Sequence, residues 1–89
     1  MDVFQTMRFF VAVAQSGSFT AAANMLDTTT TNVSKAVSSL ETRLRTRLIN
    51  RTTRRLALTE AGTRYLLRCE RILEELREAE EEAGTAQIT

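Results

Sequence analysis

Apolar side chains recur every three or four positions through most of the chain, and this spacing predicts a mainly helical fold. The first stretch predicts a helix over about residues 2–15, with Asp2 as its cap and Gly17 in the turn that ends it. Its apolar stripe consists of Phe4, Met7, Phe10, Val11 and Ala14. Ser18 is suited to cap a short second helix, whose inner face consists of Phe19, Ala22, Ala23 and Leu26. Residues 27–28 then make a tight break.

A third helix is predicted to begin after Thr29, which is a good N-cap. Its apolar stripe consists of Val33, Val37, Leu40 and Leu44. The opposite face carries short hydroxyl side chains and one cation, at Thr30, Thr31, Ser34, Lys35 and Ser38. Threonine is a mediocre helix former. The run of threonines at 28–31 therefore indicates either a function at this end of the helix or simply a threonine-rich first turn.

The period of the pattern changes after the third helix. Residues 48–49 and 56–58 are typical of two short strands around a basic turn at 50–55, which predicts a small β-hairpin. Thr59 ends the hairpin as the N-cap of a fourth helix. Gly62 lies in the first turn of that helix and indicates close packing of backbone there.

The fourth helix is predicted to run from about residue 60 to beyond residue 82. A helix of roughly 24 residues extends about 36 Å, well past a domain of this size. Its apolar seam consists of Tyr65, Cys69, Ile72, Leu76, Ala79 and Ala83, and is widened by Leu66 and Leu73. We expect a second copy of the helix to cover this seam, giving a homodimer through Tyr65, Cys69, Ile72, Leu76 and Ala79. A helix that folds back on its own domain is the alternative.

The composition excludes several kinds of site. Cys69 is the single cysteine and there is no histidine, so neither an intrachain disulfide nor a Cys/His zinc site can form. We expect no catalytic residue, no metal and no cofactor. Because Cys69 lies on the apolar seam, it is interpreted as a core or interface residue rather than a nucleophile. A lone cysteine fits the reducing cytoplasm, and neither a signal peptide nor a membrane-spanning run is evident.

The net charge of +1 hides a division along the chain. Residues 35–71 contain ten basic and three acidic side chains, whereas residues 74–82 contain six acidic and one basic. This division indicates a polyanion-binding module joined to a segment that stays away from the polyanion. An unevenly charged, solvated surface is the alternative.

A short helix, a tight turn and a third helix with a polar face form the outline of a helix-turn-helix. A helix that enters the major groove of DNA needs compact hydrogen-bonding groups on its outward face, and the hydroxyls of the third helix meet that need. Lys35 could contact either guanine or a phosphate. Arg51, Arg54 and Arg55 lie on or beside the hairpin turn, where arginine is suited to a narrow A·T-rich minor groove. A solvated cationic loop is the alternative for this turn.

Four segments of the chain form recognisable motifs. They are Met7-Arg8-x-Phe10-Val11-x-Val13-Ala14, Gly17-Ser18-Phe19-Thr20-Ala21-Ala22-Ala23, Leu40-Glu41-x-x-Leu44 and Arg47-Leu48-Ile49-Asn50-Arg51-Thr52-Thr53-Arg54-Arg55-Leu56-x-Leu58-Thr59-Glu60-Ala61-Gly62. Together they resemble the N-terminal domain of the LysR-type transcriptional regulators. The resemblance covers nearly the whole chain. It implies a winged helix-turn-helix, a linker helix that pairs with a second copy, and a following domain that binds a small-molecule effector. It also implies tetramers that bind inverted repeats near promoters.

The chain departs from the family pattern on the polar face of the third helix, which would contact the bases. The family's third helix usually opens with Ser-Gln-Pro, whose positions Thr29, Thr30 and Thr31 occupy here. Thr30 cannot make the bidentate adenine contact of which glutamine is capable, so base preference is not expected to transfer from relatives at this position. Lys35 replaces a usual arginine, Arg45 a common glycine and Ile49 a common phenylalanine.

We therefore expect a mainly α protein that binds double-stranded DNA in the bacterial cytoplasm, with a winged helix-turn-helix at 1–59 and a linker and dimerisation helix at 60–89. The expected major-groove residues are Thr30, Thr31, Ser34, Lys35 and Ser38, and the expected minor-groove residues are Arg51 and Arg54. Ser18, Thr20, Thr29 and Arg55 are expected to contact phosphates. A dimer would span half-sites about one helical turn apart. A protein-interaction module is the main rival; an enzyme is disfavoured by the lack of histidine and of a Gly-rich loop with paired carboxylates.

Overall fold

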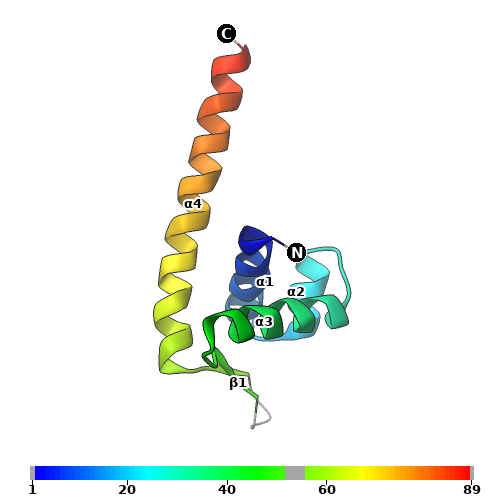
Figure 1. The fold of residues 1–89 in the computed structure, drawn as a ribbon. Coiled ribbons are helices and arrows are strands. Elements are labelled where there is room, and N and C mark those ends of the chain that lie inside the picture. The colour runs from blue at the N-terminus through cyan, green and yellow to red at the C-terminus, as the bar shows by residue number, and fades with distance from the viewer. Residues whose placement is uncertain (1, 52–55, 89) are drawn as a thin grey trace.

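The computed structural model describes residues 2–51 and 56–88, with side chains described as far as residue 84. The helices and strands are α1 (Val3–Ser16), α2 (Phe19–Met25), α3 (Thr30–Leu44), β1 (Ile49–Asn50), β2 (Ala57–Leu58) and α4 (Glu60–Ile88). Figure 1 shows α1, α2 and α3 gathered into a body, the hairpin below one end of α3, and α4 rising along one side. The predicted winged helix-turn-helix with a long final helix is confirmed.

The predicted helix caps are present in the structure. Three side chains each accept a hydrogen bond from the backbone N–H three residues further on, which satisfies a donor that has no partner inside the helix. The pairs are Asp2 with Gln5 at 2.8 Å, Ser18 with Ala21 at 2.9 Å and Thr29 with Asn32 at 3.1 Å. Gly17 ends α1 with a φ of 80°, a left-handed conformation that glycine adopts without steric cost. Local sequence thus determines where these helices begin and where α1 ends.

The core lies where α1, α3 and the first half of α4 meet, with α2 closing one side. Among its fully buried side chains are Phe10, Val13, Val33, Val37, Leu40, Leu48, Ile49 and Cys69. The apolar stripe predicted for α3 therefore faces the core, which leaves its hydroxyl-rich face outside. Phe4 is an exception to the predicted stripe of α1, since it is 41% exposed.

The turn between α2 and α3 is compact. The backbone N–H of Thr28 donates to the carbonyl of Ala23 at 2.9 Å, and Asp27 takes a left-handed φ of 52°. Aspartate is one of the few residues apart from glycine that visit this conformation with some regularity. The predicted break at 27–28 is thereby confirmed, and it sets the direction in which α3 leaves α2.

The first half of α4 packs against its own domain. Cys69 is fully buried in the core, and the ring of Tyr65 lies 5.7 Å from that of Phe10. The prediction that a second copy covers the seam is therefore wrong for Cys69, because α1 packs on this part of α4. Burial raises the pKa of the Cys69 thiol, outweighing the opposite effect of a hydrogen bond with Tyr65. Cys69 is therefore a core residue.

The second half of α4 leaves the body. The helix has 29 residues, and the longest dimension of the protein is 52 Å. Ile72 is 43% exposed and Ala79 is exposed, while Leu76 is half-buried. Among the helices that the structure describes, none is long and apolar enough to cross a membrane. The upper part of α4 thus carries an apolar side that its own domain leaves uncovered.

The start of α4 is fixed to the chain just before β1. The Thr59 hydroxyl accepts from the N–H of Gly62 at 2.9 Å and donates to the carbonyl of Arg47 at 2.6 Å. The Thr59 N–H donates to the carbonyl of Leu48 at 3.0 Å. A Cβ at position 62 would lie 2.0 Å from that same Leu48 oxygen. The close backbone packing predicted from Gly62 is confirmed.

Candidate nucleic-acid interface

The outward face of α3 is polar along most of its length. Thr30, Thr31 and Lys35 are exposed, and Ser34 and Ser38 are half-buried. They lie outside because Val33, Val37 and Leu40 turn the opposite face into the core. The structure thus places all five predicted major-groove residues on one accessible helix face.

The N-terminal end of α3 carries a polar side chain that the sequence analysis missed. Asn32 is exposed, and its side-chain amide donates to the Thr28 hydroxyl at 3.0 Å. This contact joins the turn to the first turn of α3, where backbone N–H groups and the helix dipole favour an anion. In the sequence, Asn32 lies between Thr31 and Val33 and belongs to neither the hydroxyl-rich face nor the apolar stripe, so helical spacing does not mark it as a site residue.

The wing, which is the hairpin formed by β1 and β2, is a short antiparallel pair of strands. Ile49 lies opposite Leu58 and Asn50 opposite Ala57. Leu48 and Ile49 are buried, so the start of the hairpin belongs to the core. Two predicted site residues, Arg54 and Arg55, lie outside the described residues.

Glu41 is a functional candidate that the sequence analysis did not single out. It lies on α3 and is only 7% exposed. One carboxylate oxygen accepts from the backbone N–H groups of Leu48 and Ile49, at 2.9 and 3.1 Å. The other lies 3.5 Å from the Arg47 guanidinium and 3.4 Å from that of Arg51. Its position four residues after Val37, directly beside the apolar stripe, was the available signal of burial.

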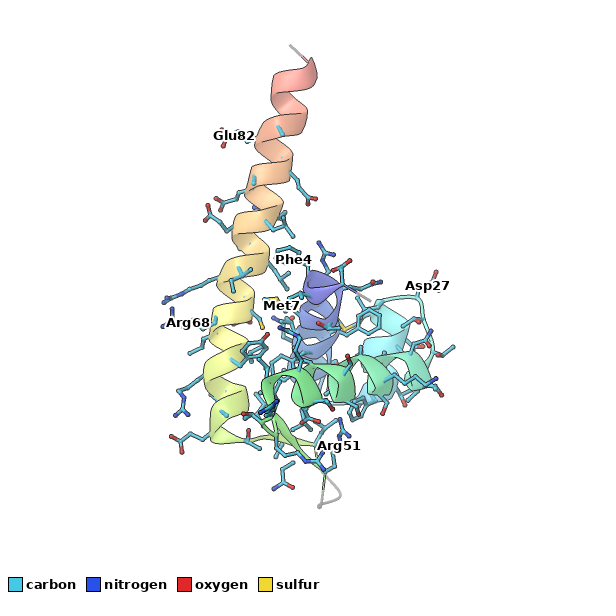
Figure 2. The ribbon with its side chains drawn as sticks, in the orientation of Figure 1. Phe4, Met7, Asp27, Arg51, Arg68 and Glu82 are labelled. Atoms are coloured by element: carbon cyan, nitrogen blue, oxygen red, sulfur yellow. The ribbon has the colours of Figure 1, made fainter. Side chains whose placement is uncertain are left out.

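Arg51 lies against the body of the protein. Its guanidinium carbon is 5.3 Å from the centre of the Phe19 ring, a cation–π distance, while its Nη2 faces Glu41. The side chain nevertheless remains 33% exposed. Figure 2 shows Arg51 below α3, beside the hairpin. The predicted wing cation is therefore held between α2 and α3 and is still accessible from outside.

Of the residues predicted to contact phosphates, the three that the structure describes lie at helix starts. Thr20 and Thr29 are exposed, whereas Ser18 is half-buried and uses its hydroxyl to cap α2. The carbonyl of Ser18 also accepts from the Ser16 hydroxyl at 3.1 Å. Thr20 and Thr29 are thus the more open of the three.

A cationic hollow separates the end of α3 from the wing. Its lining includes Ser38, Thr42, Arg45, Arg47 and Arg51. Arg45 ends α3 with a left-handed φ of 54°, and its N–H donates to the carbonyls of Glu41 and Thr42. Arg45 thus adopts a conformation that suits glycine better than a residue with a side chain. The hollow brings Arg45, Arg47 and Arg51 together with Ser38, the last of the predicted major-groove residues along α3.

Large apolar side chains are exposed both on the first turn of α1 and in the middle of α4. Val3 and Phe4 are 46% and 41% exposed, and Ile72 is 43% exposed. Figure 2 shows Phe4 on the first turn of α1. The predicted seam includes Ile72, Leu76 and Ala79 but neither Val3 nor Phe4, because Phe4 fits the apolar stripe predicted for α1.

Comparison with known proteins identifies the family. The profile of the bacterial regulatory helix-turn-helix proteins of the lysR family matches residues 4–63. An HTH-type transcriptional regulator of Xanthomonas campestris pv. campestris is 55% identical over 78 residues, 88% of this chain. This chain spans 23% of the length of that relative.

Solved structures give the same result. The chain matches a structure described as a BenM_DBD/catB site 1 DNA complex with a TM-score of 0.91 and 26% identity, covering 97% of this chain and 96% of the other. It matches a CbnR_DBD-DNA complex with a TM-score of 0.87 and 31% identity, covering 97% and 98%. With most of its sequence and nearly all of its fold accounted for in this way, the chain belongs to the LysR family of bacterial helix-turn-helix regulatory proteins.

Proposed function

We propose that this chain is the sequence-specific, double-stranded DNA-binding part of a LysR-type transcription regulator. The observation that carries the proposal is the placement of the hydroxyl-rich face of α3 beside a cationic hollow formed by Arg45, Arg47 and Arg51. A helix with compact polar groups fits a major groove, and arginines beside it suit the phosphates and the adjacent minor groove. The BenM and CbnR structures with the same fold are described as DNA complexes.

The reading helix is α3. Thr30, Thr31, Ser34, Lys35 and Ser38 contact base edges, with the threonine methyl groups available to thymine methyls. Exposure of this face supports the assignment, because a groove can reach it without any movement of the core. Thr20, Thr29 and Ser18 fix the phosphate backbone at the starts of α2 and α3.

The wing supplies the flanking contacts. Arg51 and Arg54 enter the minor groove beside the major-groove site, and Arg55 contacts a phosphate. The exposed fraction of Arg51 supports this role for the one residue of the three that the structure describes.

Two copies act together. The upper half of α4 pairs with that of a second copy through Ile72, Leu76 and Ala79, with Tyr65 at the edge and Cys69 excluded by its burial. Residues 60–89 therefore join the DNA-contacting unit at 1–59 to its mate, and two reading helices reach half-sites about one helical turn apart. Because this chain is about a quarter the length of its relatives, tetramer formation and the binding of a small-molecule effector are proposed for the remainder of the regulator. Binding to operator DNA places the protein in the bacterial cytoplasm.

The test is a titration of the chain against duplexes from the upstream region of its own operon, at several salt concentrations. We expect log affinity to fall linearly with log salt, and a footprint with twofold symmetry. A protein-interaction module would bind none of the duplexes even at low ionic strength, and that result would overturn the proposal.

Lys35→Ala sharpens the test. The change should weaken operator binding about tenfold, since one groove contact is lost. If Lys35 contacts a phosphate, the slope of log affinity against log salt should become shallower by about one. If Lys35 contacts a guanine, the protein should instead discriminate less at one base pair. Arg68→Ala is the matched control, because Arg68 is exposed on the side of α4 away from α3 (Figure 2). Equal loss in both variants would show that net charge, not the α3 face, determines binding.

A further inference from the structure

Glu41 combines two properties that rarely coincide. It is the one charged side chain in the core among the residues that the structure describes. It also lies next to the proposed DNA-binding face, since it lines the same hollow as Ser38 and Arg51. A carboxylate there repels a polyanion and costs affinity, so its presence needs an explanation other than attraction to DNA.

The two oxygens of Glu41 have different partners. Oε2 accepts from the backbone N–H groups of Leu48 and Ile49, which are the residues that lead into and begin β1. Oε1 faces the guanidinium groups of Arg47 and Arg51, one on each side of that segment. Charge-assisted hydrogen bonds of this kind are stronger than neutral ones and fix orientation.

The wing needs such an anchor. Each strand has two residues, and an isolated hairpin of that size is at best marginally stable in water. Its orientation on the body therefore depends on contacts outside the hairpin. Glu41 provides them from α3, and Phe19 adds a contact from α2 through the guanidinium of Arg51.

We propose that Glu41 is a positioning residue for DNA recognition: it holds the base of the wing and Arg51 in fixed register with the reading face of α3. Ser38 and Glu41 lie one turn apart on the same helix, so the groove-reading residues and the anchor of the wing move as one body. Glu41 lowers affinity for any duplex and raises discrimination between duplexes. This inference rests on the proposed DNA-binding function.

The test is Glu41→Gln, which keeps the shape and the ability to accept from Leu48 and Ile49 but removes the charge that holds Arg47 and Arg51. Operator and scrambled duplexes are titrated at several salt concentrations. We expect the ratio of operator to scrambled affinity to fall about tenfold. Affinity for the scrambled duplex should stay level or rise. The slope of log affinity against log salt should become steeper by about one or two, because Arg47 and Arg51 are then free to contact phosphates.

Two further variants separate positioning from folding. Glu75→Gln makes the same change of charge at an exposed site on α4 and should leave the affinity ratio unchanged. Arg51→Lys keeps the charge but loses the planar contact with Phe19, and should also reduce the ratio while Glu41 remains in place to maintain the fold. Circular dichroism monitors folding in each variant.

The outcomes are distinct. Glu41→Gln with equal losses on both duplexes, or with an unchanged ratio, would show that Glu41 only supports the fold. If Glu41→Gln fails to fold, Arg51→Lys decides, and an unchanged ratio in that variant overturns the inference. A wild-type chain that binds duplexes without preference also overturns it, whereas a wild-type chain that binds none overturns the proposed function from which it starts.

Discussion

The two halves of α4 have similar apolar spacing but different surroundings. In the lower half, Cys69 is fully buried and Gly62 touches the backbone of Leu48. In the upper half, Ile72 is 43% exposed at the edge of the body, and the residues beyond it are mostly acidic and solvated. Helical spacing thus shows that a face is apolar but not whether the same chain or another one covers it.

The electrostatics of the two halves differ as well. The lower half carries Arg64, Arg68 and Arg71, whereas the upper half holds six acidic residues around Arg77. Arg77 pairs with Glu74 at 2.6 Å and also with Glu81, and the guanidinium lowers the pKa of Glu74. The half of α4 that packs on its own domain is cationic, and the half that projects away from the domain would repel DNA.

The largest effect should come from filling the space at Gly62. Gly62→Ala places a methyl group 2.0 Å from a backbone oxygen, which must move, so we expect a loss of about 3 kcal/mol in the free energy of unfolding. Thermal denaturation followed by circular dichroism measures it. Gly84→Ala, on the same helix with open space around the position, should stabilise by up to about 1 kcal/mol through helix propensity. Similar shifts in the two variants would contradict the division of α4 into a packed and an open half.

A smaller loss of stability is expected when a serine replaces an apolar residue of the α4 seam. Cys69→Ser buries a polar group in the core and should cost about 1–3 kcal/mol in the free energy of unfolding at every protein concentration. Ile72→Ser should leave the unfolding of the monomer nearly unchanged and weaken self-association. Denaturation and sedimentation over a range of concentrations separate the two. Loss of self-association in Cys69→Ser, with its folding intact, would show that α1 does not cover this residue in solution.

The smallest effect should follow from Arg77→Ala. Removing the cation leaves the six acidic residues of the upper half without their central partner, and we expect a slight loss of helicity that grows as salt is lowered. The helical signal in circular dichroism at two salt concentrations is sufficient to measure it. The matched change Arg68→Ala should leave helicity at its wild-type level, and an equal loss there would attribute the effect to side-chain propensity rather than to the ion pairs.

The elements that the sequence predicted well are those determined locally. Asp2, Ser18 and Thr29 cap the helices as expected, because a cap depends on one side chain and a backbone N–H three residues away. The wing and the tight contact at Gly62 follow from short-range patterns of the same kind.

What the sequence did not predict depends on contacts between distant segments. The burial of Glu41 arises where α3 meets the chain entering β1, and the cover over Cys69 comes from α1. Phe4 fits a helical stripe yet remains exposed. The roles of the proposed DNA-contacting residues remain predictions.

Thr59 has a mechanical consequence. Its hydroxyl and its N–H tie the first turn of α4 to Arg47 and Leu48, and Cys69 is buried in the core, so the lower half of α4 and the root of the hairpin belong to one rigid body. A helix of 29 residues is about 43 Å long, so a rotation of that body by about 5° moves the far end of α4 through about 4 Å. A displacement at the far end of α4 therefore reaches the hairpin as the same rotation but as a much smaller displacement.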